Sequence, residues 1–185
     1  DETRLGDHIK TTVVGNAVDT IALNVERRNP FSIGLMGITP QRKRLDFALS
    51  IFDDLENYGF NPKLLIKGKM PKDFAWMKSR TKENQWYKAL QEKYNDAISN
   101  QKIVQEGYTE DIGSFFCSIS AILSTSDFES FHLAPAEGAA ARNVVAMLNW
   151  EGATDIHKRE WIANSTTELA TFLRDIQAKG IEYEI

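Results

Sequence analysis

From Phe31 onwards, short apolar runs alternate with stretches in which apolar residues recur every three or four positions. The short runs are typical of buried strands, and the recurring spacing is typical of helices with one apolar face. This alternation predicts an α/β fold: a Rossmann-like, three-layer α/β/α domain in which helices cover a parallel sheet. The predicted strands are residues 31–36, 63–67, 103–104, 121–124 and 144–147.

Five helices are predicted between and after these strands. Gly59 and Pro62 end the first, residues 109–112 provide an N-cap and an acidic first turn for the third, and Pro135 begins the fourth. A Ser-Thr-Thr-Glu cap at 165–168 precedes the last. The inward positions are Leu45, Ala48, Leu49, Phe52 and Leu55, then Trp86, Leu90, Tyr94 and Ile98, then Phe115 and Phe116, and finally Leu169, Phe172, Leu173 and Ile176. Together these elements make about five βα units.

The chain has 185 residues, which is close to the typical ~150 residues of a single domain. Residues 1–30 are polar and irregular, with one short patch at 11–16 that could be an extended strand. We interpret 1–30 as a lead-in segment and 31–185 as the domain. Neither internal repeats nor low-complexity tracts interrupt residues 31–178.

The charge balance and the scarce cysteine and histidine residues limit the function classes. Lys and Arg number 22 and Asp and Glu 26, a net charge of −4, which argues against a general nucleic-acid-binding domain. The single Cys117 lies in an apolar run, where a buried thiol is expected, and it excludes a disulfide framework. We therefore expect a reducing, cytoplasmic location, no transmembrane segment, and no metal site among His8, His132 and His157.

The stretch from Ser124 to Gly138 carries the most chemical information. If Pro135 is the first helical residue, Glu137 falls in the first turn, where the helix dipole keeps its carboxylate ionised. Such a carboxylate can accept hydrogen bonds from both hydroxyls of a ribose, while the backbone N–H groups of residues 131–133 could face a diphosphate. The alternative is an acid that merely suits the dipole. A capping box would not explain it, because Ala134 stands where Ser or Thr would be.

Glu129 and Glu137 are separated by seven residues, within a Ser-Asp-x-Glu-Ser-Phe sequence that is followed by Ala-Glu-Gly. This pattern resembles the retaining glycosyltransferases of the GT-B fold, in the glycosyl transferases group 1 family. The resemblance extends to the segment 14–20, which looks like the entry to the carboxy-terminal domain of that family. Gly37 with Lys43 looks like its phosphate-binding loop, and 107–108 and 146–153 fall where such domains have loops.

The resemblance implies that the chain is the donor-binding half of a GT-B fold. It assigns Glu137 to the ribose diol, and it places Glu129 beside the donor sugar and its leaving diphosphate. Lys43 would neutralise the diphosphate as negative charge grows on it. The alternative interpretation is that Lys43 and its basic neighbours form a solvent-exposed cluster without a ligand at a helix start, although the helix dipole disfavours cations there. The full expected donor-binding set is Gly37, Arg42, Lys43, Arg44, Gly68, Tyr108, Phe131, His132, Leu133 and Glu137, with Glu129 and Lys43 catalytic.

Two residues depart from the family pattern. Ile38 stands where the family usually has Arg, so Arg42 or Arg44 must supply the second charge, or neither does. His132 stands where the family commonly has Gly, so its side chain would crowd or contact the donor sugar or point to solvent. Tyr108 follows Gly107 where the family places the loop around the base, but a core aromatic is the favoured interpretation.

These implications lead to one functional hypothesis and one alternative. The hypothesis is transfer of a sugar from a nucleotide-sugar to an acceptor with retained anomeric configuration, in polysaccharide or glycoconjugate biosynthesis. UDP is the family's commonest nucleotide, and the donor is a substrate, so no cofactor is expected. The expected partner is an amino-terminal domain of the same enzyme, and any membrane association would come from parts outside this chain. The alternative is a non-catalytic nucleotide-binding or interaction module of the same fold.

Overall fold

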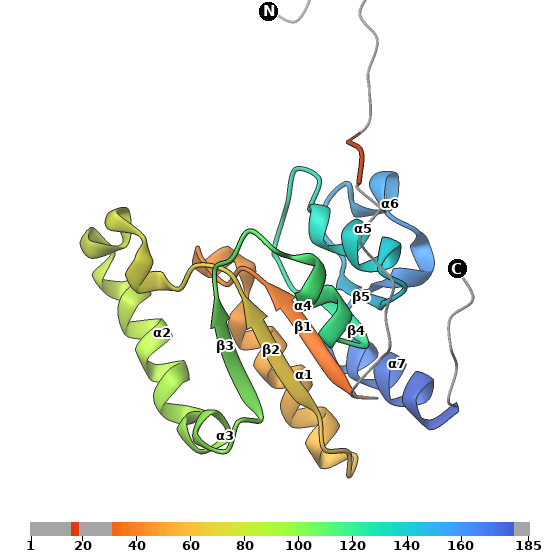
Figure 1. The fold of residues 1–185 in the computed structure, drawn as a ribbon, viewed down its shortest axis with the longest axis horizontal. Helices are drawn as coiled ribbons and strands as arrows, with labels where there is room; N and C mark the ends of the chain where they lie inside the picture. The colour runs from red at the N-terminus through yellow and green to blue at the C-terminus, as the bar shows by residue number, and fades with distance from the viewer. Residues whose placement is uncertain (1–15, 19–30, 180–185) are drawn as a thin grey trace, which may run out of the picture.

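A computed structural model describes residues 16–18 and 31–179 of the chain. Six parallel strands form one sheet in the order β3-β2-β1-β4-β5-β6. Helices cover both faces, so the predicted Rossmann-like α/β/α class is confirmed (Figure 1). The strands are β1 Ser32–Met36, β2 Lys63–Lys67, β3 Ile103–Gly107, β4 Ala121–Ser124, β5 Val144–Leu148 and β6 Ile162–Ala163. The predicted strand at 11–16 and the lead-in lie almost entirely outside the described residues.

The helices divide between the two faces of the sheet. On one face lie α1 (Leu45–Asn57), α2 (Thr81–Lys93), α3 (Asn95–Ser99) and α7 (Thr166–Lys179), and on the other lie α4 (Gly113–Ser118) and α5 (Leu133–Ala140). A short helix, α6 (Ala153–Ile156), packs near the end of β5. The remaining turns are the 3₁₀ segments η1 (Gln41–Lys43), η2 (Pro71–Asp73), η3 (Ala75–Ser79) and η4 (Arg159–Trp161).

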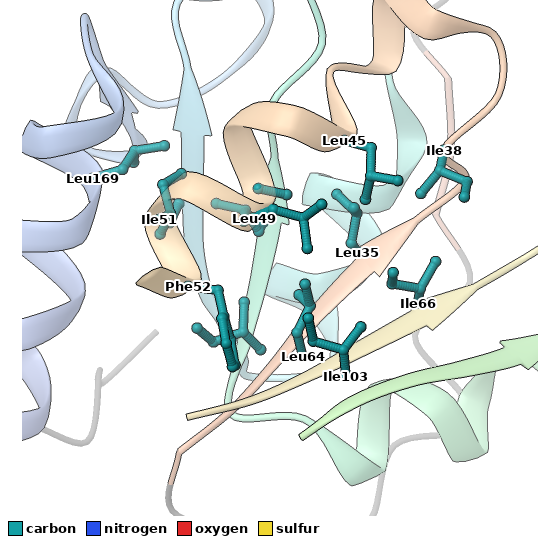
Figure 2. Packing of buried hydrophobic residues seen from close by; sticks show 14 of the residues in the cluster. Leu35, Ile38, Leu45, Leu49, Ile51, Phe52, Leu64, Ile66, Ile103 and Leu169 are labelled. Carbon is teal, nitrogen blue, oxygen red and sulfur yellow. The ribbon is translucent and has the colours of Figure 1, made fainter. Parts of the chain in front are cut away.

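Alternation along the strands builds two separate cores. In β2, Leu64 and Ile66 face the α1 side, whereas Leu65 faces α4. Figure 2 shows the α1 side, where Phe52 and its neighbours from α1 pack on Leu64 and other strand residues. Residues from both faces of one sheet are therefore buried, which explains why the strands are continuous apolar runs in the sequence.

The structure corrects the sequence predictions on three points: a missed strand, the start of one helix and the burial of Cys117. A sixth strand, β6, is only two residues long and pairs with the end of β5, so it gives almost no apolar run to detect. Helix α4 begins at Gly113 rather than near residue 109, with the Asp111 carboxylate accepting from the Ser114 N–H at 3.2 Å. Cys117 is partly exposed rather than buried.

One close approach sets the position of α5 against the sheet. A Cβ atom on Gly138 would lie 2.4 Å from the Ile122 side chain of β4, so only glycine allows the helix to lie this near. This contact fixes the height of α5, and with it the position of Glu137 one residue earlier. In the described part of the chain, no helix is both long and apolar enough to cross a bilayer.

Candidate donor-binding site

The strand order reverses direction between β1 and β4, which are neighbours in the sheet. In open parallel sheets, ligands bind beyond the carboxyl ends of the strands at such a reversal. Here the two loops that leave this point are residues 37–44, between β1 and α1, and residues 125–132, between β4 and α5. These loops hold most of the residues singled out from the sequence.

Backbone contacts join the two loops to each other. The Asp127 N–H donates to the Arg42 carbonyl at 2.8 Å, and the Thr125 hydroxyl donates to the Lys43 carbonyl at 2.9 Å. Thr125 is fully buried. The β1–α1 loop and the β4–α5 loop are thereby held as one unit, although about 85 residues separate them in the chain.

The structure brings Lys43, Arg42 and Glu129 together. Lys43 Nζ donates to Glu129 Oε1 at 2.5 Å, and Arg42 Nη1 lies 3.2 Å from Glu129 Oε2. Ser126 adds a hydroxyl donor to Glu129 Oε1 at 2.8 Å. Burial alone would raise the pKa of Glu129, but the hydrogen bonds from Lys43 and Ser126 outweigh it and lower the pKa to about 2. Glu129 is therefore ionised at neutral pH. It is paired with Lys43 and Arg42, two of the three cations that were expected to bind a diphosphate.

The structure separates the two arginines that could supply the second positive charge. Arg44 is engaged by two carboxylates, with bonds of 2.8 Å to Asp46 and 2.8 Å to Asp127, and its guanidinium lies over the Phe47 ring. Arg42 instead reaches Glu129 and the carbonyl of residue 128, next to Lys43. The geometry therefore favours Arg42 over Arg44 as the companion of Lys43.

Ile38 cannot contribute to a polar site, because its side chain is buried in the core on the α1 side. Figure 2 shows it near Leu45. Its carbonyl accepts a hydrogen bond from the Tyr87 hydroxyl at 2.6 Å. The residue at this position therefore anchors the loop after Gly37 to α2.

His132 adopts a left-handed backbone conformation with φ of 60°, which explains why a glycine would suit the position. The ring does not point to solvent, which the sequence had left open. It is partly buried, and its Nδ1 atom lies 2.8 Å from the hydroxyl of Ser124 at the end of β4. Burial, reinforced by the charge of Lys43, lowers the pKa of His132 to about 4. The ring is neutral at physiological pH.

The prediction for Glu137 needs a correction. Helix α5 begins at Leu133, with His132 as its N-cap, so Pro135 is the third helical residue and Glu137 lies beyond the first turn. The dipole argument for an ionised carboxylate therefore fails. Burial instead raises the pKa of Glu137. Residues 131–133 do lie at the helix N-terminus, as expected, with the Leu133 side chain exposed.

Glycines with positive φ end three adjacent strands. Gly37, Gly68 and Gly107 follow or close β1, β2 and β3, with φ of 74°, 118° and 74°. The Gly68 N–H donates to the Gly107 carbonyl at 2.9 Å, and a Cβ on Gly68 would touch the Gly37 backbone at 3.5 Å. This edge of the sheet presents main chain rather than side chains.

Tyr108 follows this glycine edge, and the prediction of a core aromatic is wrong. Its side chain is 64% exposed, and Lys69 Nζ lies 5.5 Å from its ring centroid. The strand ends after Gly107, so the next residue leaves the sheet instead of entering the core. Tyr108 is therefore available to a ligand at the ends of β2 and β3.

Sequence reasoning missed two contributors to the site, Ser126 and His157. Ser126 holds Glu129, as described above, and a hydroxyl three residues before an acid is the pattern of a helix cap, which does not indicate a binding site. Buried His157 places Nε2 2.8 Å from the carbonyl of Phe131, and its ring lies among those of Phe131, Trp150 and Trp161. It follows α6, 26 residues after the loop that it supports, so only the folded chain reveals its role.

Comparison with solved structures identifies the architecture. The chain superimposes on TarM with a TM-score of 0.71 at 14% identity, over 91% of this chain and 32% of that one. It matches the C-terminal domain of a glycosyl transferase group 1 family protein (LpcC) from Francisella tularensis with a TM-score of 0.66 at 16% identity, over 91% and 92% of the two chains. This chain has the fold of the carboxy-terminal domain of GT-B glycosyltransferases.

Other structures of this type carry nucleotides. Anabaena HepE, solved in complex with UDP-glucose, matches with a TM-score of 0.66 at 16% identity, over 82% of this chain and 40% of that one. Neither a scan against protein-family models nor a search of curated proteins gives a match. The chain spans about a third of the length of TarM. It corresponds to one of the two domains of the GT-B fold.

Proposed function

We propose that this chain is the donor-binding domain of a retaining glycosyltransferase, which binds a nucleotide-sugar, with UDP as the nucleotide. The observation that carries the proposal is the meeting of Lys43, Arg42 and Glu129 at the strand-order reversal, in a domain of GT-B fold. Fold alone would be weak support, since one fold hosts many functions. The charged cluster adds a site at the position where the fold binds ligands.

The cationic pair is suited to a diphosphate. Lys43 and Arg42 can each donate charge-assisted hydrogen bonds to phosphate oxygens, and their charges oppose the negative charge that develops when the glycosidic bond breaks. Glu129 already accepts a hydrogen bond from Lys43 and forms an ion pair with Arg42. A bound diphosphate would compete with Glu129, so donor binding would release this carboxylate from Lys43.

The released Glu129 would lie beside the donor sugar. The Ser126 hydroxyl, which donates to Glu129, would still favour the anionic form, so the role of Glu129 there is to orient sugar hydroxyls and to stabilise positive charge near the anomeric carbon. We assign it no covalent step. Retention of configuration is part of the proposal, and product analysis by NMR with the complete enzyme would test it.

The nucleoside would lie over the glycine edge and α5. Glu137, half-buried on α5, would accept hydrogen bonds from the ribose diol once it is ionised. The main chain at Gly68 and Gly107 and the exposed Tyr108 ring would receive the base. Similar structures support UDP as the nucleotide, since HepE was solved with UDP-glucose and the pneumococcal O-GlcNAc transferase GtfA with UDP and GlcNAc.

Transfer itself would require a second domain. In the proposal, an amino-terminal domain positions the acceptor and closes over the donor, because oriented binding of both reactants supplies much of the rate gain. Residues 1–30 would form the lead-in from that domain. The chain alone would then bind donor without transferring sugar.

Calorimetric titration of the chain with UDP, GDP and ADP tests the proposal. We expect UDP to bind most tightly, and we expect salt to weaken binding because a small cationic cluster meets a diphosphate. Absence of binding to all three nucleotides would refute the donor-binding function.

A non-catalytic nucleotide-binding module of the same fold is the rival. The burial of Ile38, where the family usually has Arg, and the His132 side chain at a glycine position favour it. A natural full-length protein that binds UDP-sugars but transfers and hydrolyses none of them would establish this rival.

A further inference from the structure

A cavity of about 250 Å³ lies on the α1 side of the sheet, between α1, α2 and the strands β2 and β3. Most of its wall is apolar, and Figure 2 shows five of these side chains between α1 and the strands. The apolar residues that form its floor and sides include Ile38, Leu45, Leu49, Ile66, Leu90 and Ile103.

This cavity opens to solvent at Lys72, Lys88 and Gln91, so it is a recess in the surface of the domain rather than a void in the core. A volume of 250 Å³ corresponds to about eight waters, yet the aliphatic wall offers them few hydrogen-bond partners. An apolar occupant that covers the exposed part of this apolar floor would be favoured by the hydrophobic effect.

The mouth of the cavity is polar and carries positive charge. Its exposed side chains include Lys72, Lys88, Gln91 and Gln105, and no aspartate or glutamate lines it. Lys88 makes only an exposed contact of 3.7 Å with Glu92, on the next turn of α2. An apolar interior below two lysines matches a molecule with an apolar tail and an anionic head.

We infer that this cavity binds a small amphiphile made of a straight alkyl chain and one carboxylate. The volume limits the chain to a medium length, because the cavity has room for only about eight waters. Binding would bury the alkyl chain against the leucines and isoleucines and leave the carboxylate at the mouth near Lys72 and Lys88. The cavity lies under α2 on the α1 side of the sheet, whereas the proposed donor site lies beyond the carboxyl ends of the strands and over α5, so this inference does not depend on the proposed function.

Three eight-carbon probes test the inference: octanoate, octanol and octylammonium. Calorimetric titration of the chain should show octanoate binding most tightly, octanol more weakly and octylammonium most weakly. Methyl NMR should place the largest shifts at Leu90, Ile98 and Ile103, which line the cavity. Equal binding of octanoate and octylammonium, or shifts confined to other parts of the molecule, would overturn the proposal.

Two sets of variants separate the cavity from the charges. Leu90→Trp fills the cavity and should abolish octanoate binding, and Ile98→Phe serves the same purpose if Leu90→Trp does not fold. Replacing Lys72 and Lys88 together by alanine should weaken octanoate about fivefold, the scale of exposed charge pairs, and leave octanol unchanged. The matched control replaces the exposed Lys78 and Lys82, which lie outside the cavity wall. Unchanged octanoate affinity in a folded cavity-filling variant would refute the site.

Discussion

The two sides of the candidate site are prepared for a ligand in different ways. Where β1 meets β4, charged side chains are already paired, with Lys43 and Arg42 on Glu129. Where β2 meets β3, glycines expose main chain, and Tyr108 projects into solvent. A ligand must therefore exchange partners on the paired side, whereas on the open side it only adds contacts. Substitutions on the paired side should change chemistry and charge dependence, and those on the open side should change affinity.

The largest effect is expected from a substitution of Glu129, on the paired side. In the natural full-length protein, Glu129→Gln should lower turnover by about 10²-fold or more, because the anion beside the reacting sugar is lost. UDP affinity should rise, since glutamine no longer neutralises Lys43 and Arg42. Steady-state kinetics and calorimetry measure the two quantities.

The control for this substitution is Glu160→Gln, an exposed acid in η4. It should leave both turnover and UDP affinity unchanged. If Glu129→Gln instead weakened UDP binding by the same factor as turnover, Glu129 would be a ligand of the nucleotide rather than a competitor of it.

A second substitution compares two cations that lie one residue apart. Lys43→Ala should weaken UDP binding about 10- to 100-fold, as for a lost charge-assisted hydrogen bond, and should leave uridine binding nearly unchanged. Arg44→Ala should have a much smaller effect, because Arg44 is already held by Asp46 and Asp127. Similar losses for the two variants would mean that the whole basic segment acts as a diffuse charge.

A third test concerns Glu137, which lies on α5 outside both of these sides, and it uses pH. Burial raises the pKa of Glu137, so the ionised form that accepts ribose hydroxyls is gained as pH rises through that pKa. Binding of UDP should strengthen over this range. The same shift favours the folded state at low pH, because the folded chain holds the proton more tightly than the unfolded chain. Its contribution to stability is lost as pH rises from about 4.5 through the raised pKa.

Glu137→Gln should remove this pH dependence of UDP affinity. At neutral pH the substitution should weaken UDP binding several-fold. It should weaken the binding of 2′-deoxy-UDP less, because one partner hydroxyl is already absent. Equal losses for both nucleotides would show that the carboxylate does not contact the ribose.

The fold could be predicted from local patterns where those patterns are strong. Leu64-Leu65-Ile66 and Val144-Val145 are continuous apolar runs because both faces of the sheet are covered, and their strand type followed from the sequence. The strand β6 was not predicted, because two residues cannot form such an apolar run. The start of α5 was misplaced because Pro135 is tolerated throughout the first turn, and a left-handed His132 as N-cap has no sequence signature.

The candidate site was less predictable, because its contacts join distant segments. Nothing near residue 42 indicates that Arg42 rather than Arg44 reaches Glu129, since the choice depends on how the β4–α5 loop lies on the β1–α1 loop. The exposure of Tyr108 depends on where β3 ends. The resemblance of short motifs to the GT-B family singled out the acids and the basic cluster, but the pairing between them came only from the fold.

The smallest expected effect concerns the support beneath the paired side. Burial raises the pKa of Tyr87 to about 12, so its hydroxyl is protonated at neutral pH and donates to the Ile38 carbonyl at 2.6 Å. Tyr87→Phe should lower the free energy of unfolding by about 1 kcal/mol, the usual value for one hydrogen bond, and should weaken UDP by less than about twofold. Denaturant unfolding and calorimetry measure the two effects. Tyr58→Phe, at an exposed ring, is the matched control and should change neither. If the two variants behaved alike, the β1–α1 loop would hold its cations without help from α2, and the pairing with Glu129 alone would account for its conformation.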